Sequence, residues 1–110
     1  MASPETDVYD VFGKHIIPGY IAPITRIGLV EIGLVKQTRD FAERGSFNPN
    51  VKANVSYNPD SDLIPITRSN GVLVVNSVPA GGRISGQSSV MMLDGWTWEQ
   101  ATLKLSLIHI

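Results

Sequence analysis

Cysteine is absent from this 110-residue chain, and histidine occurs only twice, at His15 and His109. The lack of thiols excludes disulfide bonds, cysteine nucleophiles and thiolate metal sites within the chain. Two imidazoles cannot build a three-histidine zinc site, so any metal held here would depend on carboxylates. We therefore expect no metal and no other cofactor to be bound by this chain alone.

An excess of charge of one sign is also missing, because 9 Lys and Arg stand against 10 Asp and Glu. A nucleic-acid-binding domain needs a basic excess, so we expect no nucleic-acid partner. No apolar run is long enough to cross a bilayer, and we expect no membrane span. The first ten residues, MASPETDVYD, lack the basic and then apolar pattern of a secretory signal. The sequence does not decide between a cytoplasmic and an exported parent protein.

The composition that remains is globular, with 43% hydrophobic and 17% charged residues. The N-terminal part carries short β-type runs at residues 8–12, 15–17 and 20–30. Pro23 lies inside the third run and removes a donor from a β-ladder. This strand is therefore predicted to be short, to lie at a sheet edge, or to begin at Ile24.

The middle of the chain predicts a strand–helix–strand unit. Residues 31–58 are irregular, with one or two helical turns predicted over residues 35–44. A helix is predicted over residues 63–70, after N-cap candidates at residues 60–62, and Gly71 is suited to end it. The apolar run at residues 72–75 is typical of a strand covered on both faces. With a further helix predicted over residues 96–103, the order of elements predicts an α/β fold with a parallel sheet.

A glycine-rich stretch follows the buried strand. Gly81, Gly86 and Ser88 have the spacing of a phosphate-binding loop, but Gln87 replaces the lysine, so we do not expect nucleotide binding. A loop after a parallel strand lies at the carboxyl end of the sheet, where α/β proteins hold their ligands. The candidate site residues are those of this loop: Gly81, Gly82, Arg83, Ser85, Gly86, Gln87 and Ser88.

Two segments, residues 13–21 (GKHIIPGYI) and residues 70–95 (NGVLVVNSVPAGGRISGQSSVMMLDG), carry a family resemblance. They resemble the start of an amidohydrolase-superfamily barrel of the imidazolonepropionase-like kind. The resemblance implies a partial (β/α) TIM-barrel-type fragment with a few strands of a small N-terminal β-sandwich. It places residues 1–19 in the sandwich and residues 20–104 in the first β/α units of the barrel.

The metal-binding motif of that family is replaced in this chain. In the family, D-x-H-x-H follows the first segment, and its histidines hold a catalytic divalent metal such as zinc. The corresponding positions here are Ala22, Ile24 and Arg26. Neither Ile nor Arg ligates a metal, so no catalytic or metal-binding residue is carried over. The resemblance implies either an altered metal site or a pseudo-enzyme that has lost hydrolysis.

The length and the last residues predict a truncated reading frame. A complete barrel takes about 250 residues, more than this chain has. Residues 105–110 (LSLIHI) are also what the DNA string CTGTCTCTTATACACATC encodes, and that string is similar to a transposase adapter end of sequencing libraries. We therefore expect residues 105–110 to be a non-native tail, as in a metagenomic fragment. A real apolar C-terminal strand is the alternative.

The resemblance implies a longer parent that hydrolyses C–N bonds in small-molecule amides or cyclic amides with a metal-activated water. A homo-oligomeric parent is compatible with the resemblance, whereas the fragment itself is expected to be inactive. The alternative is a small, complete, non-catalytic α+β domain that binds a ligand or a partner. Open strand edges and an uncovered apolar face would make the fragment aggregate, while a complete domain would unfold cooperatively.

Overall fold

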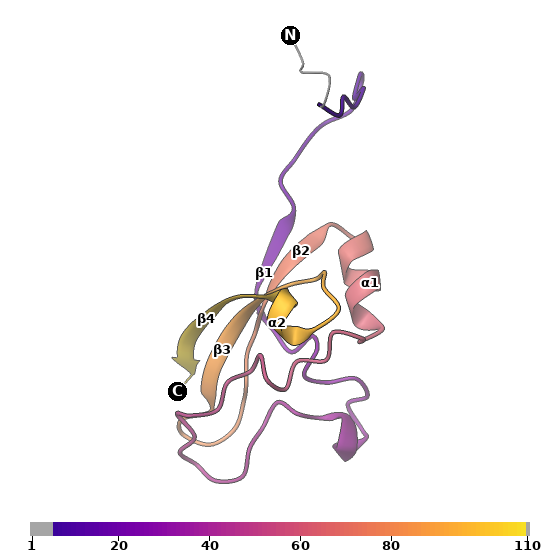
Figure 1. Cartoon of the computed structure of the whole chain (residues 1–110). Coiled ribbons are helices and arrows are strands. Elements are labelled where there is room, and N and C mark those ends of the chain that lie inside the picture. The colour runs from indigo at the N-terminus through magenta and orange to yellow at the C-terminus, as the bar shows by residue number, and fades with distance from the viewer. Residues whose placement is uncertain (1–5, 110) are drawn as a thin grey trace.

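We describe the backbone of residues 6–109 and the side chains of residues 6–105 in a computed structural model. The centre of the fold is a four-stranded sheet with the strand order β1-β2-β3-β4 (Figure 1). The elements along the chain are β1 (Tyr20–Thr25), the 3-10 helix η1 (Lys36–Thr38), α1 (Leu63–Ser69), β2 (Val72–Ser77), β3 (Gly86–Met92), α2 (Trp98–Ala101) and β4 (Thr102–His109). No helix in the described part of the chain is long and apolar enough to cross a membrane.

The predicted strand–helix–strand unit is confirmed, because β1 and β2 pair in parallel and α1 connects them. Gly71 follows the helix with a φ of +87°, a conformation that glycine adopts without strain. At the start of α1, the Ser61 hydroxyl accepts a hydrogen bond from the Leu63 N–H at 3.4 Å, and Asp62 makes no capping bond. Pro23 is tolerated because β1 lies at the sheet edge, where one ladder donor can be lost.

The sheet is mixed, so the prediction of a parallel sheet is wrong beyond β1 and β2. β3 runs antiparallel to β2, and β4 runs antiparallel to β3. The connection over residues 78–85 is too short for a parallel crossover, which needs about a dozen residues. The helix predicted over residues 96–103 shrinks to the single turn of α2, because the chain from Thr102 onward pairs with β3. Of this predicted fold, the structure confirms the mixed α/β class.

The N-terminal segment does not form the two predicted strands at residues 8–12 and 15–17. Residues 6–19 belong to no strand and extend away from the sheet (Figure 1). The Phe12 side chain is 97% exposed. A two-stranded ribbon without a further partner is only marginally stable in water, which accounts for the difference.

Two further regions of the chain bear on the predictions. The helical turns predicted over residues 35–44 are reduced to η1, and the rest of residues 31–58 is irregular, as predicted. At the other end of the chain, the backbone of residues 105–109 lies in β4 and pairs with β3, His109 opposite Gly86. The adapter origin of this tail stays a prediction.

The core lies on one face of the sheet. Val75 and Ser77 share one face of β2 and are fully buried, whereas Val74 and Asn76 on the other face stay partly exposed. The prediction that both faces of β2 are covered is therefore wrong for the second face. Trp98 packs against the core, and Trp96 is exposed. The buried core residues are Tyr57, Ile64, Val75, Met91, Leu93 and Ala101.

Tyr57 makes the stability of this core depend on pH. Its hydroxyl is buried without a hydrogen-bond partner among the described residues, and burial raises the pKa of Tyr57 from 10.0 to about 12. Since the folded pKa lies above the unfolded one, this contribution to stability is complete below pH 10 and is lost as the pH rises to 12. We expect the free energy of unfolding to fall by about 2–3 kcal/mol across that window.

Urea unfolding at pH 9 and pH 12, compared with Tyr57→Phe, checks this expectation. The variant removes the titrating hydroxyl but keeps the ring, so it should lose this part of the pH dependence. At pH 7 it should be at least as stable as the parent, because the deleted hydroxyl has no partner to leave unpaired. Equal pH dependence in the two proteins would contradict the assignment to Tyr57.

Candidate functional site

A cavity of about 520 Å³ lies at the carboxyl ends of the parallel strands β1 and β2. Its wall comes from the end of β1 and from the loop that follows β2. Ligand sites of α/β proteins occur at this edge, and small-molecule sites commonly measure about 300–1,000 Å³. The lining residues are Ile24, Thr25, Arg26, Val78, Pro79, Ala80, Gly81, Gly82 and Ser85. We call this space the β1–β2 cavity.

The structure separates the candidate residues predicted in the glycine-rich stretch. Gly81, Gly82 and Ser85 line the β1–β2 cavity. Arg83 belongs to the same loop, but its side chain is exposed and is not part of the lining. The other three candidates lie in strand β3 rather than in a loop: Gly86, Gln87 and Ser88. Their functional role, and that of the lining residues, stays a prediction.

The loop after β2 is held by its own side chain and by the irregular segment of residues 31–58. The Ser85 hydroxyl donates to the Gly81 carbonyl at 2.7 Å. The Ala80 N–H donates to the Phe41 carbonyl at 2.7 Å, and the N–H groups of residues 83 and 84 both donate to the Ser46 carbonyl. The loop after β2 and the irregular segment therefore lie side by side next to the cavity.

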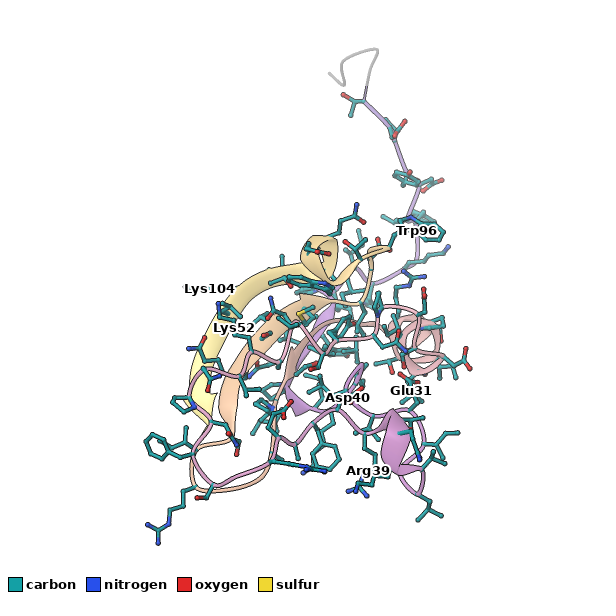
Figure 2. The ribbon with its side chains drawn as sticks, turned by 60° about the horizontal axis from the view of Figure 1, so that its bottom comes forward. Glu31, Arg39, Asp40, Lys52, Trp96 and Lys104 are labelled. Atoms are coloured by element: carbon teal, nitrogen blue, oxygen red, sulfur yellow. The ribbon has the colours of Figure 1, made fainter. Side chains whose placement is uncertain are left out.

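Two arginines share one aromatic ring at this end of the molecule. The guanidinium carbon of Arg26 lies 4.5 Å from the centre of the Phe41 ring, and that of Arg39 lies 5.0 Å from it. A second cavity of about 390 Å³ is lined by both arginines and Phe41, and it shares Thr25 and Arg26 with the β1–β2 cavity. Figure 2 looks toward this end and labels Arg39, together with Glu31 and Asp40.

Glu31 lines the second cavity but is bound to neutral groups. Its carboxylate accepts hydrogen bonds from the Asn58 amide at 3.2 Å and from the Ser61 hydroxyl at 2.9 Å. Among the described residues, neither Arg26 nor Arg39 makes an ion pair. Both guanidinium groups thus lack a carboxylate partner in this part of the chain.

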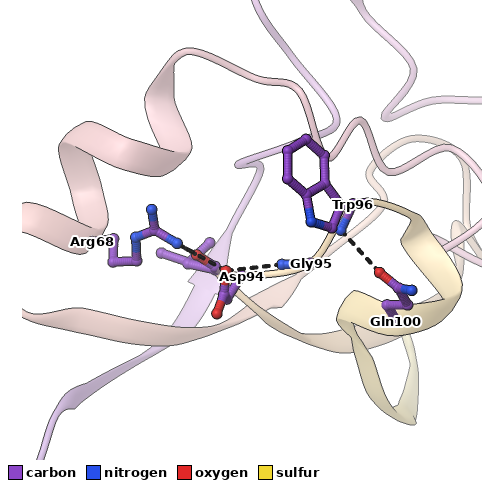
Figure 3. A network of polar contacts seen from close by, with 6 residues as sticks. Arg68, Asp94, Gly95, Trp96 and Gln100 are labelled. Atoms are coloured by element: carbon purple, nitrogen blue, oxygen red, sulfur yellow. Dashed lines mark hydrogen bonds and ion pairs between the residues drawn. The ribbon is translucent and has the colours of Figure 1, made fainter.

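Arg68 shows the opposite arrangement at the other end of β2. It donates to the Asp94 carboxylate at 3.0 Å and also to the Leu93 carbonyl (Figure 3). The same carboxylate accepts from the Gly95 N–H. This pair is largely exposed to solvent, so it adds little stability, but it satisfies the Arg68 charge.

A divalent metal does not fit the residues at the β1–β2 cavity. Ile24 and Arg26 are the two residues that the resemblance in the sequence predicts at the family's histidine positions. Isoleucine offers no donor atom, and the guanidinium stays protonated. In residues 6–105, no group of three His, Cys, Asp or Glu side chains is placed to hold a metal ion. No metal-dependent step is therefore assigned to this chain.

The relationship to known proteins comes from a solved structure. No protein-family model matches the sequence, and no curated protein matches it. The crystal structure of an amidohydrolase from Thermotoga maritima MSB8 is similar, with a TM-score of 0.84 and 29% sequence identity. The match covers 94% of this chain and 28% of that one. The chain is thus similar to part of an amidohydrolase, and the resemblance seen in the sequence is confirmed at that coarse level.

Proposed function

We propose that this chain is part of a hydrolase of the imidazolonepropionase-like kind that cleaves C–N bonds in small-molecule amides or cyclic amides. The observation that carries the proposal is the β1–β2 cavity, which lies at the carboxyl ends of a parallel pair in a chain similar to an amidohydrolase. Residues 20–104 would be the first β/α units of a TIM barrel, and residues 1–19 part of a β-sandwich. Residues 105–110 would be the adapter-derived tail.

The chain's own contribution would be to bind and orient a substrate. Ile24 and Val78 give the cavity apolar wall, and Arg26 gives it a charged donor. A divalent metal such as zinc, if the parent uses one, would have to be held by residues other than Ile24 and Arg26. We therefore propose that the 110-residue chain alone is inactive.

The reading frame tests the proposal first. The source DNA is sequenced across codon 104 from a library made without transposase adapters, and the continuous frame is expressed. We expect the frame to extend by a barrel's worth of residues and the longer protein to hydrolyse at least one compound of an amide and cyclic amide panel. A stop codon directly after codon 110 would instead favour the non-catalytic binding domain.

Metal content gives a second test on the chain itself. Purified residues 1–110 should retain no stoichiometric zinc. The double variant Ile24→His/Arg26→His should gain zinc binding, because both side chains line one cavity and alternate residues of an extended segment share a face. Equilibrium dialysis with elemental analysis measures both.

The matched control is Ile21→His/Ile24→His, whose two histidines are three residues apart along the same strand. We expect the Ile24→His/Arg26→His variant to bind zinc about tenfold more tightly than this control, since only the former can chelate the ion. One zinc ion bound per unmodified chain would contradict the proposal that Ile24 and Arg26 have removed the metal site.

A further inference from the structure

We infer that the β1–β2 cavity binds a small organic anion, with its carboxylate on Arg26 and its apolar body against the cavity wall. The inference deepens the proposed function, and it rests on that function for treating the anion as a substrate or product. The binding itself follows from charge, exposure and cavity lining, and it is measured without turnover.

The first argument is the charge of the lining. Of the described residues that form the cavity, Arg26 is the one with an ionisable side chain, so no carboxylate within the lining offsets its charge. The Arg26 side chain is exposed to solvent at the cavity, and its guanidinium makes no hydrogen bond or ion pair with the described residues. An incoming anion therefore displaces water from the guanidinium and breaks no internal ion pair.

The second argument is the position of the guanidinium groups on Phe41. A guanidinium that stacks on a ring contacts it with its flat face, so the N–H groups along its edge stay available. Two of these N–H groups can donate parallel hydrogen bonds to one carboxylate. Arg39 lies on the same ring and raises the local positive charge. Glu31 does not cancel it by direct pairing, because its oxygens accept from Asn58 and Ser61.

The third argument selects the body of the ligand. Apart from Arg26, the cavity wall has four apolar side chains, Ile24, Val78, Pro79 and Ala80, beside the polar Thr25 and Ser85. A bare inorganic anion would leave this wall in contact with water. A carboxylate attached to an apolar group can pair with the guanidinium and also bury the apolar side chains of the wall, which favours an organic acid.

Benzoate and benzamide are the probes, because they have nearly the same shape and differ in charge. Each is titrated into residues 1–110 at pH 7 and followed by NMR chemical shifts. We expect benzoate to bind at least about tenfold more tightly than benzamide, and Arg26→Gln to weaken benzoate by about tenfold, as for the loss of a charged hydrogen bond. Arg26→Lys keeps the positive charge but cannot donate two parallel hydrogen bonds to a carboxylate, so we expect an intermediate loss of benzoate affinity.

Arg83→Gln is the matched control. It removes the same charge from the loop after β2, at an exposed side chain that does not line the cavity, and should change benzoate affinity by less than about twofold. Equal losses in Arg26→Gln and Arg83→Gln would reduce the effect to general electrostatic attraction and overturn the inference. Equal binding of benzoate and benzamide, or no saturable benzoate binding at 50 mM, would overturn it as well.

The two proposals fail in different ways. A longer protein without amide hydrolysis, together with Arg26-dependent benzoate binding, would remove the proposed function and keep the anion site. Amide hydrolysis that is insensitive to benzoate, with no benzoate binding to the chain, would remove the anion site and keep the function. Circular dichroism of each variant confirms that the fold is unchanged before affinities are compared.

Discussion

Met91→Ala is expected to lower the free energy of unfolding by about 2–5 kcal/mol, the range for truncating a fully buried methionine. Met91 is 0% exposed and lies in β3, opposite Val75 of β2 and Thr102 of β4. The Thr102 hydroxyl also lies 3.6 Å from the Met91 sulfur. Truncation therefore leaves a cavity where three strands meet, and the strands cannot close it without breaking their hydrogen-bonded register.

Urea denaturation followed by circular dichroism measures the change. Leu34→Ala is the control, because the Leu34 side chain is 99% exposed and its loss should change stability by less than about 0.5 kcal/mol. A domain of this size is stable by only about 5–15 kcal/mol, so Met91→Ala removes a substantial part of the total. A loss no larger than that of Leu34→Ala would mean that this side of the sheet is not packed.

Gly28→Ala is the second substitution with a large expected effect, again about 2–5 kcal/mol. Gly28 has a φ of +79°, and an added Cβ would lie 2.4 Å from Cδ2 and Cε2 of the buried Tyr57 ring. The backbone cannot retreat easily, because the Gly28 carbonyl accepts a hydrogen bond of 2.8 Å from the Asn58 N–H. Backbone strain and overpacking of the core therefore act together.

Gly71→Ala separates these two causes. Gly71 has a similar φ of +87°, but its added Cβ would meet the Tyr20 ring at 3.6 Å, an ordinary contact. It should therefore show the backbone strain alone, about 1–2 kcal/mol. Both variants are measured by urea unfolding. Equal losses of unfolding free energy would show that the Tyr57 ring moves to make room for the added methyl group, and that the core is less rigid than inferred.

Local pattern was enough to predict the β1–α1–β2 unit. The apolar run of β2 and the glycine before it act through short-range preferences, which a sequence shows directly. Strand β3 is different, because Val90 is its only residue of a strand-favouring type. It forms through pairing with β2 and β4 on its two sides. The N-terminal segment shows the converse, since a strand-like pattern forms no strand when no partner lies beside it.

The candidate site divides in the same way. A loop after a strand can be located from the sequence, and Gly81, Gly82 and Ser85 do lie at the cavity. In the sequence, Arg26 stands out only as the replacement of a metal ligand, and no pattern marks Arg39 or Phe41. Their meeting depends on the fold of an irregular segment, in which Val30 forms a bridge with Arg39. No short-range pattern in the sequence encodes that meeting.

The hydrogen bond between the Ala80 N–H and the Phe41 carbonyl has a consequence for how stability and affinity are related. It joins two segments without regular secondary structure, and Phe41 carries both guanidinium groups on its ring. Local opening of such loops and global unfolding of a sheet are separate processes with different free energies. Substitutions around Phe41 can therefore change which ligand the cavities prefer, while the buried face of the sheet, which includes Met91, stays unchanged.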